Sequence, residues 1–154
     1  MSPLRLERVP FDHPDAVLLR DRMVAEVATV YGSQRDYASG DGAKGVDASD
    51  VLVTLVAYAG DQPVAHALLR RLRDDVEIKR MFVDPAARGA GAAHVLMQAL
   101  EDEARAVDAT RIVLHTGDRQ LAAVRTYERH GYMPIPVYEP YVGMPASLCF
   151  EKVL

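Results

Sequence analysis

The sequence predicts an α+β (α/β) fold built around a mixed sheet. Three strand-like segments follow one another in the middle of the chain, at 51–58, 64–73 and 76–83. After them, apolar residues recur three or four positions apart, which marks helices that alternate with further strands. This order of elements is typical of helices layered on a sheet.

The N-terminal third is expected to hold a strand, a helix and a long loop. Segment 4–9 carries loosely alternating apolar residues before a proline, which is typical of an edge strand. A helix is expected from the capping region 12–14 to about residue 31, since apolar residues recur at helical spacing. Residues 33–49 are rich in Ser, Gly, Asp and Ala, which predicts a loop longer than most connections.

The three middle strands are expected to form an antiparallel meander, because the turns at 60–63 and 74–75 have hairpin length. The C-terminal third then predicts a helix that begins near Gly89 and a strand at 111–116. An amphipathic helix over 121–130 and a closing strand over 147–153 complete the pattern.

The composition predicts one domain, 1–154, in the cytoplasm. A chain of 154 residues with 49% hydrophobic residues can bury a full core without disulfides or metal clips. The net charge of −4 argues against nucleic-acid binding, and the apolar run 51–59 is too short to span a membrane. The N-terminus lacks a signal-peptide pattern, and the single cysteine, Cys149, is expected to pack in the core.

Two glycine patterns are candidate phosphate sites. Residues 40–45 match G-x-G-x-x-G, but no strand precedes them, so a nucleotide site is not expected there. Residues 88–93, Arg-Gly-Ala-Gly-Ala-Ala, lie where a strand turns into a helix, and the free N–H groups of a helix N-terminus attract a pyrophosphate. On spacing alone, a tight packing turn without a ligand is an equally good interpretation.

The chain resembles the GNAT superfamily of acyl-CoA-dependent N-acetyltransferases at three motifs. The family's phosphate loop, Q/R-x-x-G-x-G/A, is matched by residues 88–93, and its V-D-P-x-x-R-G approach is matched by 83–89. Residues 123–132 are similar to its A-x-x-L-Y-x-x-x-G-F segment. Two positions depart from the pattern: Gln120 replaces a frequent Asn, and Thr126 replaces the Leu before the tyrosine.

The resemblance implies a GNAT-like, mostly antiparallel sheet of six to seven strands, with helices on both faces and a split between strands 4 and 5. It also implies acetyl-CoA as cosubstrate, with the pantetheine arm in that split. The residues implied to bind the cofactor are Met81, Phe82, Val83, Arg88, Gly89, Ala90, Gly91, Ala92, Ala93, Gln120 and Tyr127.

The resemblance implies two catalytic residues. Glu77 stands eleven residues before Arg88, as the catalytic glutamate does in several members, and would act as general base, through water. The alternative is a solvated strand charge paired with Lys79 or Arg80. Tyr127 matches the tyrosine that contacts the CoA sulfur and would protonate it; the alternative is a core aromatic. Backbone N–H groups near residues 81 and 82 would polarise the thioester carbonyl.

Acceptor-side residues are less clearly marked. Aromatic and acidic side chains suit a cationic amine, although a packed surface turn is the alternative for the 137–143 segment. The candidates are Tyr31, Glu77, His115, Tyr138 and Tyr141. The five histidines show no ligand spacing, so no metal site is expected.

The sequence thus predicts an acetyl-CoA-dependent N-acetyltransferase acting on the primary amine of a small molecule, such as an amino acid or polyamine, by direct attack in a ternary complex. Protein lysine or N-terminal acetylation and a non-catalytic acyl-CoA-binding module are the alternatives. No nucleic-acid or membrane partner is expected, and a homodimer is left open.

Overall fold

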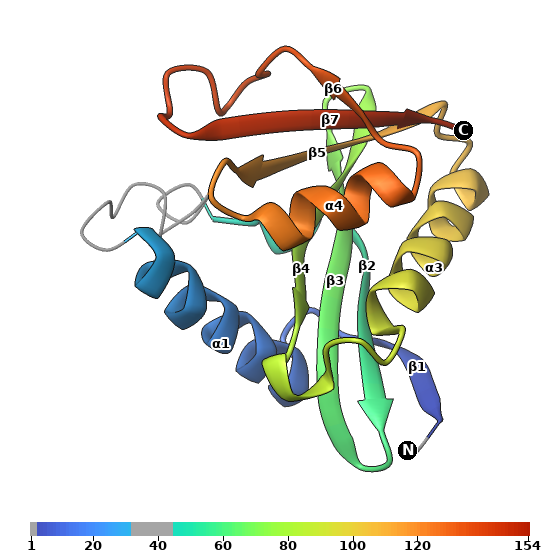
Figure 1. Cartoon of the computed structure of the whole chain (residues 1–154). Helices are drawn as coiled ribbons and strands as arrows, with labels where there is room; N and C mark the ends of the chain where they lie inside the picture. The colour runs from blue at the N-terminus through green and yellow to red at the C-terminus, as the bar shows by residue number, and fades with distance from the viewer. Residues whose placement is uncertain (1–2, 32–44) are drawn as a thin grey trace.

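The computed structural model describes residues 3–31 and 45–154, in which a seven-stranded sheet has the order β1-β2-β3-β4-β5-β7-β6 (Figure 1). The strands are β1 (Leu4–Val9), β2 (Val51–Ala59), β3 (Gln62–Leu72), β4 (Asp75–Val83), β5 (Arg111–Gly117), β6 (Met133–Ile135) and β7 (Ser147–Val153). The helices are α1 (Pro14–Tyr31), α3 (Ala92–Ala106) and α4 (Leu121–Arg129), with the short 3₁₀ turns η2 (Ala48–Asp50) and η3 (Pro85–Ala87).

The predicted fold class is confirmed, with two local differences. The strand β6 was not predicted, because three residues with a central proline give no strand pattern; such a segment fits at a sheet edge. Helix α3 begins at Ala92 rather than near Gly89, because Gly89 and Gly91 have φ values of +89° and +88° and prolong the turn. The glycine pattern at 40–45 lies almost wholly outside the described residues.

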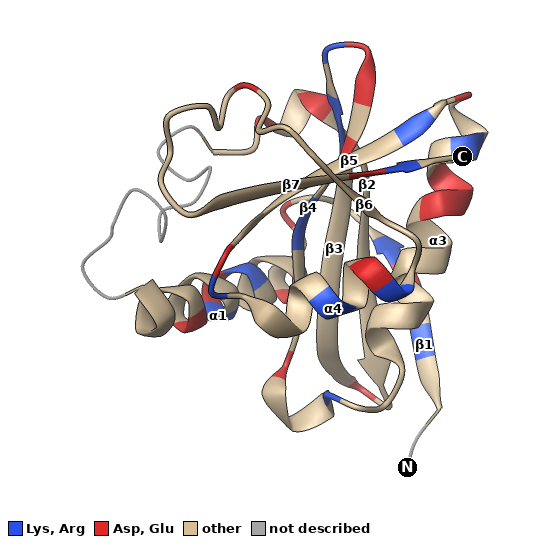
Figure 2. Cartoon of the chain, turned by 45° about the horizontal axis from the view of Figure 1, so that its top comes forward, with Lys and Arg blue, Asp and Glu red and all other residues tan. Residues whose placement is uncertain are grey.

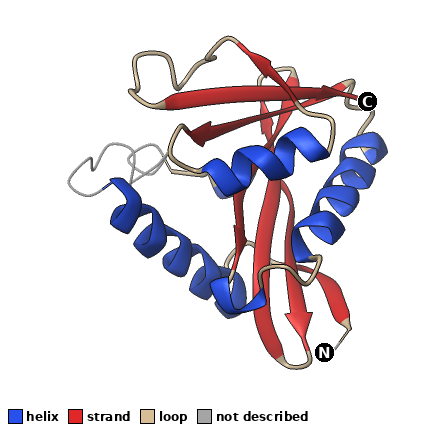
Figure 3. Ribbon diagram, in the orientation of Figure 1, coloured by secondary structure: helices blue, strands red, loops and turns tan. Residues whose placement is uncertain are grey.

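Helices cover both faces of the sheet, as expected (Figure 3). Leu96, Met97 and Leu100 of α3 are buried in one cluster with inward residues of β2 to β5. On the other face, Ala16 and Leu19 of α1 pack in a second cluster with Phe82. The period-two alternation of strand side chains therefore distributes β4 residues between the two layers.

The parallel pairing between β4 and β5 is short. It joins Val76–Ile78 to Ile112–Leu114, after which both strands continue in different directions (Figure 1). Strand β4 stays on β3, where His66 pairs with Phe82, but a bulge interrupts the ladder between His66 and Leu68. Among residues 3–31 and 45–154, no strand pairs with the β5-facing edge of β4 at residues 81–83. The predicted split between the fourth and fifth strands is thus present.

His66 is a fully buried polar residue that links α1, β3 and β4. Arg20 of α1 lies 3.0 Å from its Nε2, and the Arg80 carbonyl lies 2.8 Å from its Nδ1. Because a guanidinium can only donate, Nε2 accepts and Nδ1–H donates to the carbonyl. Burial lowers the pKa of His66 to about 4, so the imidazole is neutral in the folded protein at neutral pH.

This depressed pKa predicts an acid-dependent loss of stability. An unfolded histidine titrates near 6.5, so the unfolded state binds more protons between about pH 6.5 and 4, and the free energy of unfolding falls by up to about 3 kcal/mol over that window. Urea unfolding at pH 7.5 and pH 5 measures it. The variant His66→Asn, which does not titrate there, should lose less stability between these pH values than the wild type; an equal loss would contradict the assignment.

Candidate active site

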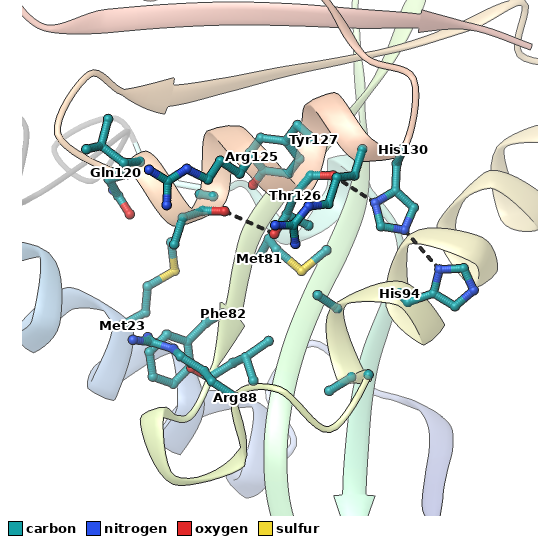
Figure 4. A pocket seen from close by; sticks show the side chains of 18 of the residues that line it. Met23, Met81, Phe82, Arg88, His94, Gln120, Arg125, Thr126, Tyr127 and His130 are labelled. Carbon is teal, nitrogen blue, oxygen red and sulfur yellow. Dashed lines mark hydrogen bonds between the residues drawn. The ribbon is translucent and has the colours of Figure 1, made fainter.

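A pocket of about 1290 Å³ lies between α1, the end of β4, the turn into α3 and helix α4 (Figure 4). Every residue predicted to bind the cofactor lines this pocket except Ala90. These lining residues are Met81, Phe82, Val83, Arg88, Gly89, Gly91, Ala92, Ala93, Gln120 and Tyr127. The structure therefore brings two separate sequence motifs, the glycine turn and the 123–132 segment, to the same cavity.

The turn into α3 leaves the helix N-terminus open to the pocket. Gly91 is the N-cap residue and makes no side-chain capping bond, so the first N–H groups of α3 keep their hydrogen-bonding capacity. A Cβ built on Gly89 or Gly91 would meet nothing within 4 Å, so glycine is required there for its positive φ and not for lack of space in the protein. Such a terminus suits an anion.

The charge around the pocket is positive, although the chain as a whole carries −4. Basic positions lie on α4 and on the turns that flank the pocket (Figure 2). The lining cations are Arg88, Arg119, Arg125, Arg129 and Lys152, against the two carboxylates Glu26 and Glu101. An anionic ligand is therefore attracted to this face of an acidic protein.

The Arg88 side chain has a partner that the motif does not predict. Its Nη2 lies 2.6 and 2.8 Å from the two carboxylate oxygens of Glu26 on α1, and its Nε donates to the Val83 carbonyl at 3.0 Å. The guanidinium thus ties α1 to the end of β4. For Arg88 to contact a phosphate, as predicted, the phosphate has to share the guanidinium with Glu26 or replace it.

Tyr127 faces the pocket from α4 and is only 5% exposed (Figure 4). Its ring packs at 6.1 Å from Tyr132 and 6.4 Å from Phe150, measured between ring centroids. Burial raises the pKa of Tyr127, which keeps the phenol protonated and able to donate a hydrogen bond. Tyr127 is thus both a core aromatic residue and a residue of the pocket wall.

Glu77 does not line the cofactor pocket. It is fully buried and accepts hydrogen bonds from Arg70 Nε at 2.8 Å and from the Tyr138 hydroxyl at 2.5 Å. The Tyr141 hydroxyl lies 3.3 Å away. The alternative of a solvated strand charge is therefore wrong, and the ion-pair partner is Arg70, its cross-strand neighbour on β3.

Four of the five predicted acceptor residues form one cluster. His115 stacks on Tyr141 with ring centroids 3.9 Å apart, and Tyr138 and Tyr141 both contact Glu77. Lys79 Nζ donates to the Tyr141 hydroxyl at 2.7 Å. This group is called the Glu77 cluster below and consists of Arg70, Glu77, Lys79, His115, Tyr138 and Tyr141.

Tyr31 lies apart from the Glu77 cluster. Its hydroxyl accepts a hydrogen bond from the Arg119 backbone N–H at 2.9 Å, and its side chain is buried at the end of α1. The Arg119 guanidinium lies over its ring. Tyr31 therefore fixes the loop before α4 to α1, next to the pocket wall that Arg119 and Gln120 form.

Several pocket residues were not found from the sequence. Arg125 and Arg129 stand four apart on α4, a spacing that places both on one helix face and would have identified them. Glu26 and the neighbouring α1 residues carry no motif, because their role depends on the docking of α1. His94 and His130 approach to 3.1 Å between Nδ1 and Nε2, bridging α3 and the end of α4.

Within residues 3–31 and 45–154, no group of three or more His, Cys, Asp or Glu side chains is placed to hold a metal ion. None of the helices there combines the length and the apolarity that a membrane crossing requires.

Because Glu77 is fully buried, replacing its carboxylate with a neutral side chain should destabilise the folded protein strongly. Glu77→Gln leaves the buried Arg70 guanidinium without the carboxylate charge, which should lower the free energy of unfolding by about 3–5 kcal/mol. Asp75→Asn is the matched control, because the Asp75–Arg111 pair at 2.9 Å is partly exposed and should cost at most about 1 kcal/mol. Equal losses for the two variants in urea unfolding would contradict this account of the cluster.

Comparisons with known proteins agree with this geometry. A Klebsiella pneumoniae protein provisionally named acyl-CoA N-acyltransferase superposes with a TM-score of 0.81 at 25% identity, covering 98% of this chain and 97% of that chain. The PaiA N-acetyltransferase of Thermoplasma acidophilum, solved in complex with coenzyme A, superposes with a TM-score of 0.75 at 12% identity over 99% of both chains.

A sequence relative and a family model complete the comparison. An IAA acetyltransferase from Azospirillum brasilense is 40% identical over 78 residues, or 51% of this chain, so the match spans about half the length of that relative. The model of the acetyltransferase (GNAT) family matches residues 23–132, which include α3, α4 and most of the pocket. The chain belongs to the acetyltransferase (GNAT) family.

Proposed function

We propose that this protein transfers the acetyl group of acetyl-CoA to the primary amine of a small molecule, such as an amino acid or a polyamine. The observation that carries the proposal is that residues 81–83 of β4, which face no further strand in the described part of the chain, line the same pocket as the open N-terminus of α3. An extended, amide-containing arm can pair with such an edge as an added strand would, while its pyrophosphate binds the helix N-terminus.

The pocket offers each part of acetyl-CoA a chemically suitable partner. The pantetheine amides would pair with the backbone of 81–83, and the pyrophosphate would accept hydrogen bonds from the N–H groups of Ala92 and Ala93. Arg125 and Arg129 on α4 would face the remaining phosphate. The coenzyme A complex of the structurally similar Thermoplasma protein supports this choice of ligand.

Tyr127 is the proposed proton donor to sulfur. When the amine nitrogen attacks the thioester carbon, the C–S bond breaks and the CoA thiolate leaves, while the amine loses a proton. The Tyr127 hydroxyl has no hydrogen-bond partner among the described residues and faces the pocket, so it is available to the departing sulfur. Its loss in Tyr127→Phe should slow acetyl transfer by about 10²-fold or more if it acts as general acid.

Glu77 is the proposed base, and its burial defines how it would act. The carboxylate is enclosed by Arg70 and by the hydroxyls of Tyr138 and Tyr141. A proton from the amine would therefore reach it through one of these hydroxyls or a water beside them. Activity of Glu77→Gln has to be compared per folded molecule, because the same substitution removes a buried ion-pair partner.

A pair of glycine variants tests the proposed function. Gly91→Ala and Gly60→Ala both place a side chain at a positive φ, +88° and +61°, with no protein atom within 4 Å of the new Cβ. Both should therefore lose about 1–2 kcal/mol of stability. Only Gly91→Ala should weaken CoA binding, by roughly tenfold or more in calorimetry, since Gly91 lies at the phosphate end of the pocket and Gly60 in the β2–β3 turn.

Turnover is then measured as release of free CoA from acetyl-CoA with a panel of acceptors. The panel holds amino acids, polyamines, a lysine peptide and, because of the named relative, IAA. Release with small amines supports the proposal, and release with the peptide alone supports protein acetylation. Tight binding of acetyl-CoA without release of CoA for any acceptor would contradict the transferase proposal and favour a non-catalytic acyl-CoA-binding module. Failure of the wild type to bind acetyl-CoA would contradict the whole assignment.

A further inference from the structure

We propose that His66 is a positioning residue for acetyl transfer. Its imidazole holds the Arg80 carbonyl so that the Met81 N–H, which belongs to the same peptide unit, points toward the cofactor pocket as a hydrogen-bond donor to the thioester carbonyl. This inference rests on the proposed function, because it requires acetyl-CoA in that pocket.

The hydrogen bonds of His66 fix both the orientation and the tautomer of its ring. The ring is completely buried, with Arg20 donating to Nε2 at 3.0 Å and Nδ1–H donating to the Arg80 carbonyl at 2.8 Å. Arg20 is itself held by the Phe11 carbonyl at 2.5 Å. Both ring nitrogens are therefore engaged, and a buried donor of this kind stays directed at one acceptor.

The Arg80 carbonyl, which accepts the hydrogen bond from His66, lies at the bulge of β4. The ladder pairs Phe82 with His66 and Lys79 with Leu68, so Arg80 and Met81 stand opposite the single residue Ala67. Arg80 has a φ of +58°, a left-handed conformation that is unfavourable for a residue other than glycine. Such a conformation persists where its surroundings hold it in place, and the His66 bond to its carbonyl is a contact that does so.

The direction of the Met81 N–H follows from the geometry of the peptide unit. The C=O and N–H groups of one trans peptide point in opposite directions. The Arg80 carbonyl points toward His66, which Arg20 contacts from the α1 side of the sheet. The Met81 N–H therefore points away from that side. Met81 itself packs with the α3-side cluster and lines the cofactor pocket (Figure 4).

An N–H group held in this way is suited to transition-state stabilisation. Negative charge develops on the thioester oxygen as the amine attacks, and a donor that is already oriented needs no reorganisation at that moment. Removing one such donor typically slows an acyl-transfer enzyme by about 10²- to 10³-fold in kcat. His66 would thus act on kcat through the backbone, without touching the substrate.

Infrared spectroscopy of bound acetyl-CoA, ¹³C-labelled at the thioester carbonyl, tests the proposal without a known acceptor. His66→Asn keeps a donor near the position of Nδ1, whereas His66→Leu removes it. Thr54→Val is the matched control, because Thr54 is also buried and polar but lies on β2, away from the bulge. We expect a lowered carbonyl frequency in the wild type, His66→Asn and Thr54→Val, and a frequency close to that of free acetyl-CoA in His66→Leu.

The affinity for CoA, which lacks the carbonyl, should stay within about threefold of the wild type in all three variants. With a confirmed acceptor, kcat of His66→Leu should fall by about 10²-fold while KM is unchanged, with rescue in His66→Asn. An unshifted carbonyl in the wild type, or the same shift in His66→Leu, would overturn the inference and leave the proposed function standing. No acetyl-CoA binding by the wild type would instead overturn the proposed function itself.

A measurement on the wild type covers the case in which His66→Leu does not fold. The Met81 amide proton should move downfield in the NMR spectrum when acetyl-CoA replaces CoA, because the carbonyl is then its acceptor. An unchanged Met81 resonance would overturn the inference.

Discussion

The site depends on the hydrogen-bonding requirement of the β4 backbone. Strand β4 lies in the interior of the sheet, yet its pairing with β5 ends at Ile78, five residues before the strand does. Backbone groups at this depth need partners, and a β-strand edge is a template for any extended amide chain. Because the bulge at Arg80 turns the strand while it remains on β3, residues 81–83 and the N-terminus of α3 line one pocket.

The positively charged pocket and the Glu77 cluster are two separate groups of side chains. The positively charged pocket has the α3 turn and α4 along its walls, whereas the Glu77 cluster is buried around β4 and the β6–β7 connection. Its single acidic member, Glu77, is neutralised by Arg70. Glu77 therefore does not offer the unpaired negative charge that would suit a cationic amine, and such an acceptor would meet hydroxyls and an ion pair.

Much of this architecture follows from patterns local in the sequence. Strand-like segments joined by turns of hairpin length predicted the meander. The glycine turn at 88–93 predicted the phosphate end of the pocket, because a helix N-terminus needs no distant partner to bind an anion. Contacts between elements far apart along the chain were not predictable. The Glu26–Arg88 pair joins residues 62 positions apart. The hydrogen bond from His66 to the Arg80 carbonyl lies at a bulge that no pattern in the sequence predicts.

Backbone hydrogen exchange of the wild-type protein with and without CoA tests the central claim most directly. If the cofactor pairs with the edge of β4 at residues 81–83, the amides of 81–83 and of the first turn of α3 should exchange at least about tenfold more slowly when calorimetry shows CoA to be bound. Saturating CoA that leaves exchange at 81–83 unchanged, and protects amides elsewhere, would contradict the account.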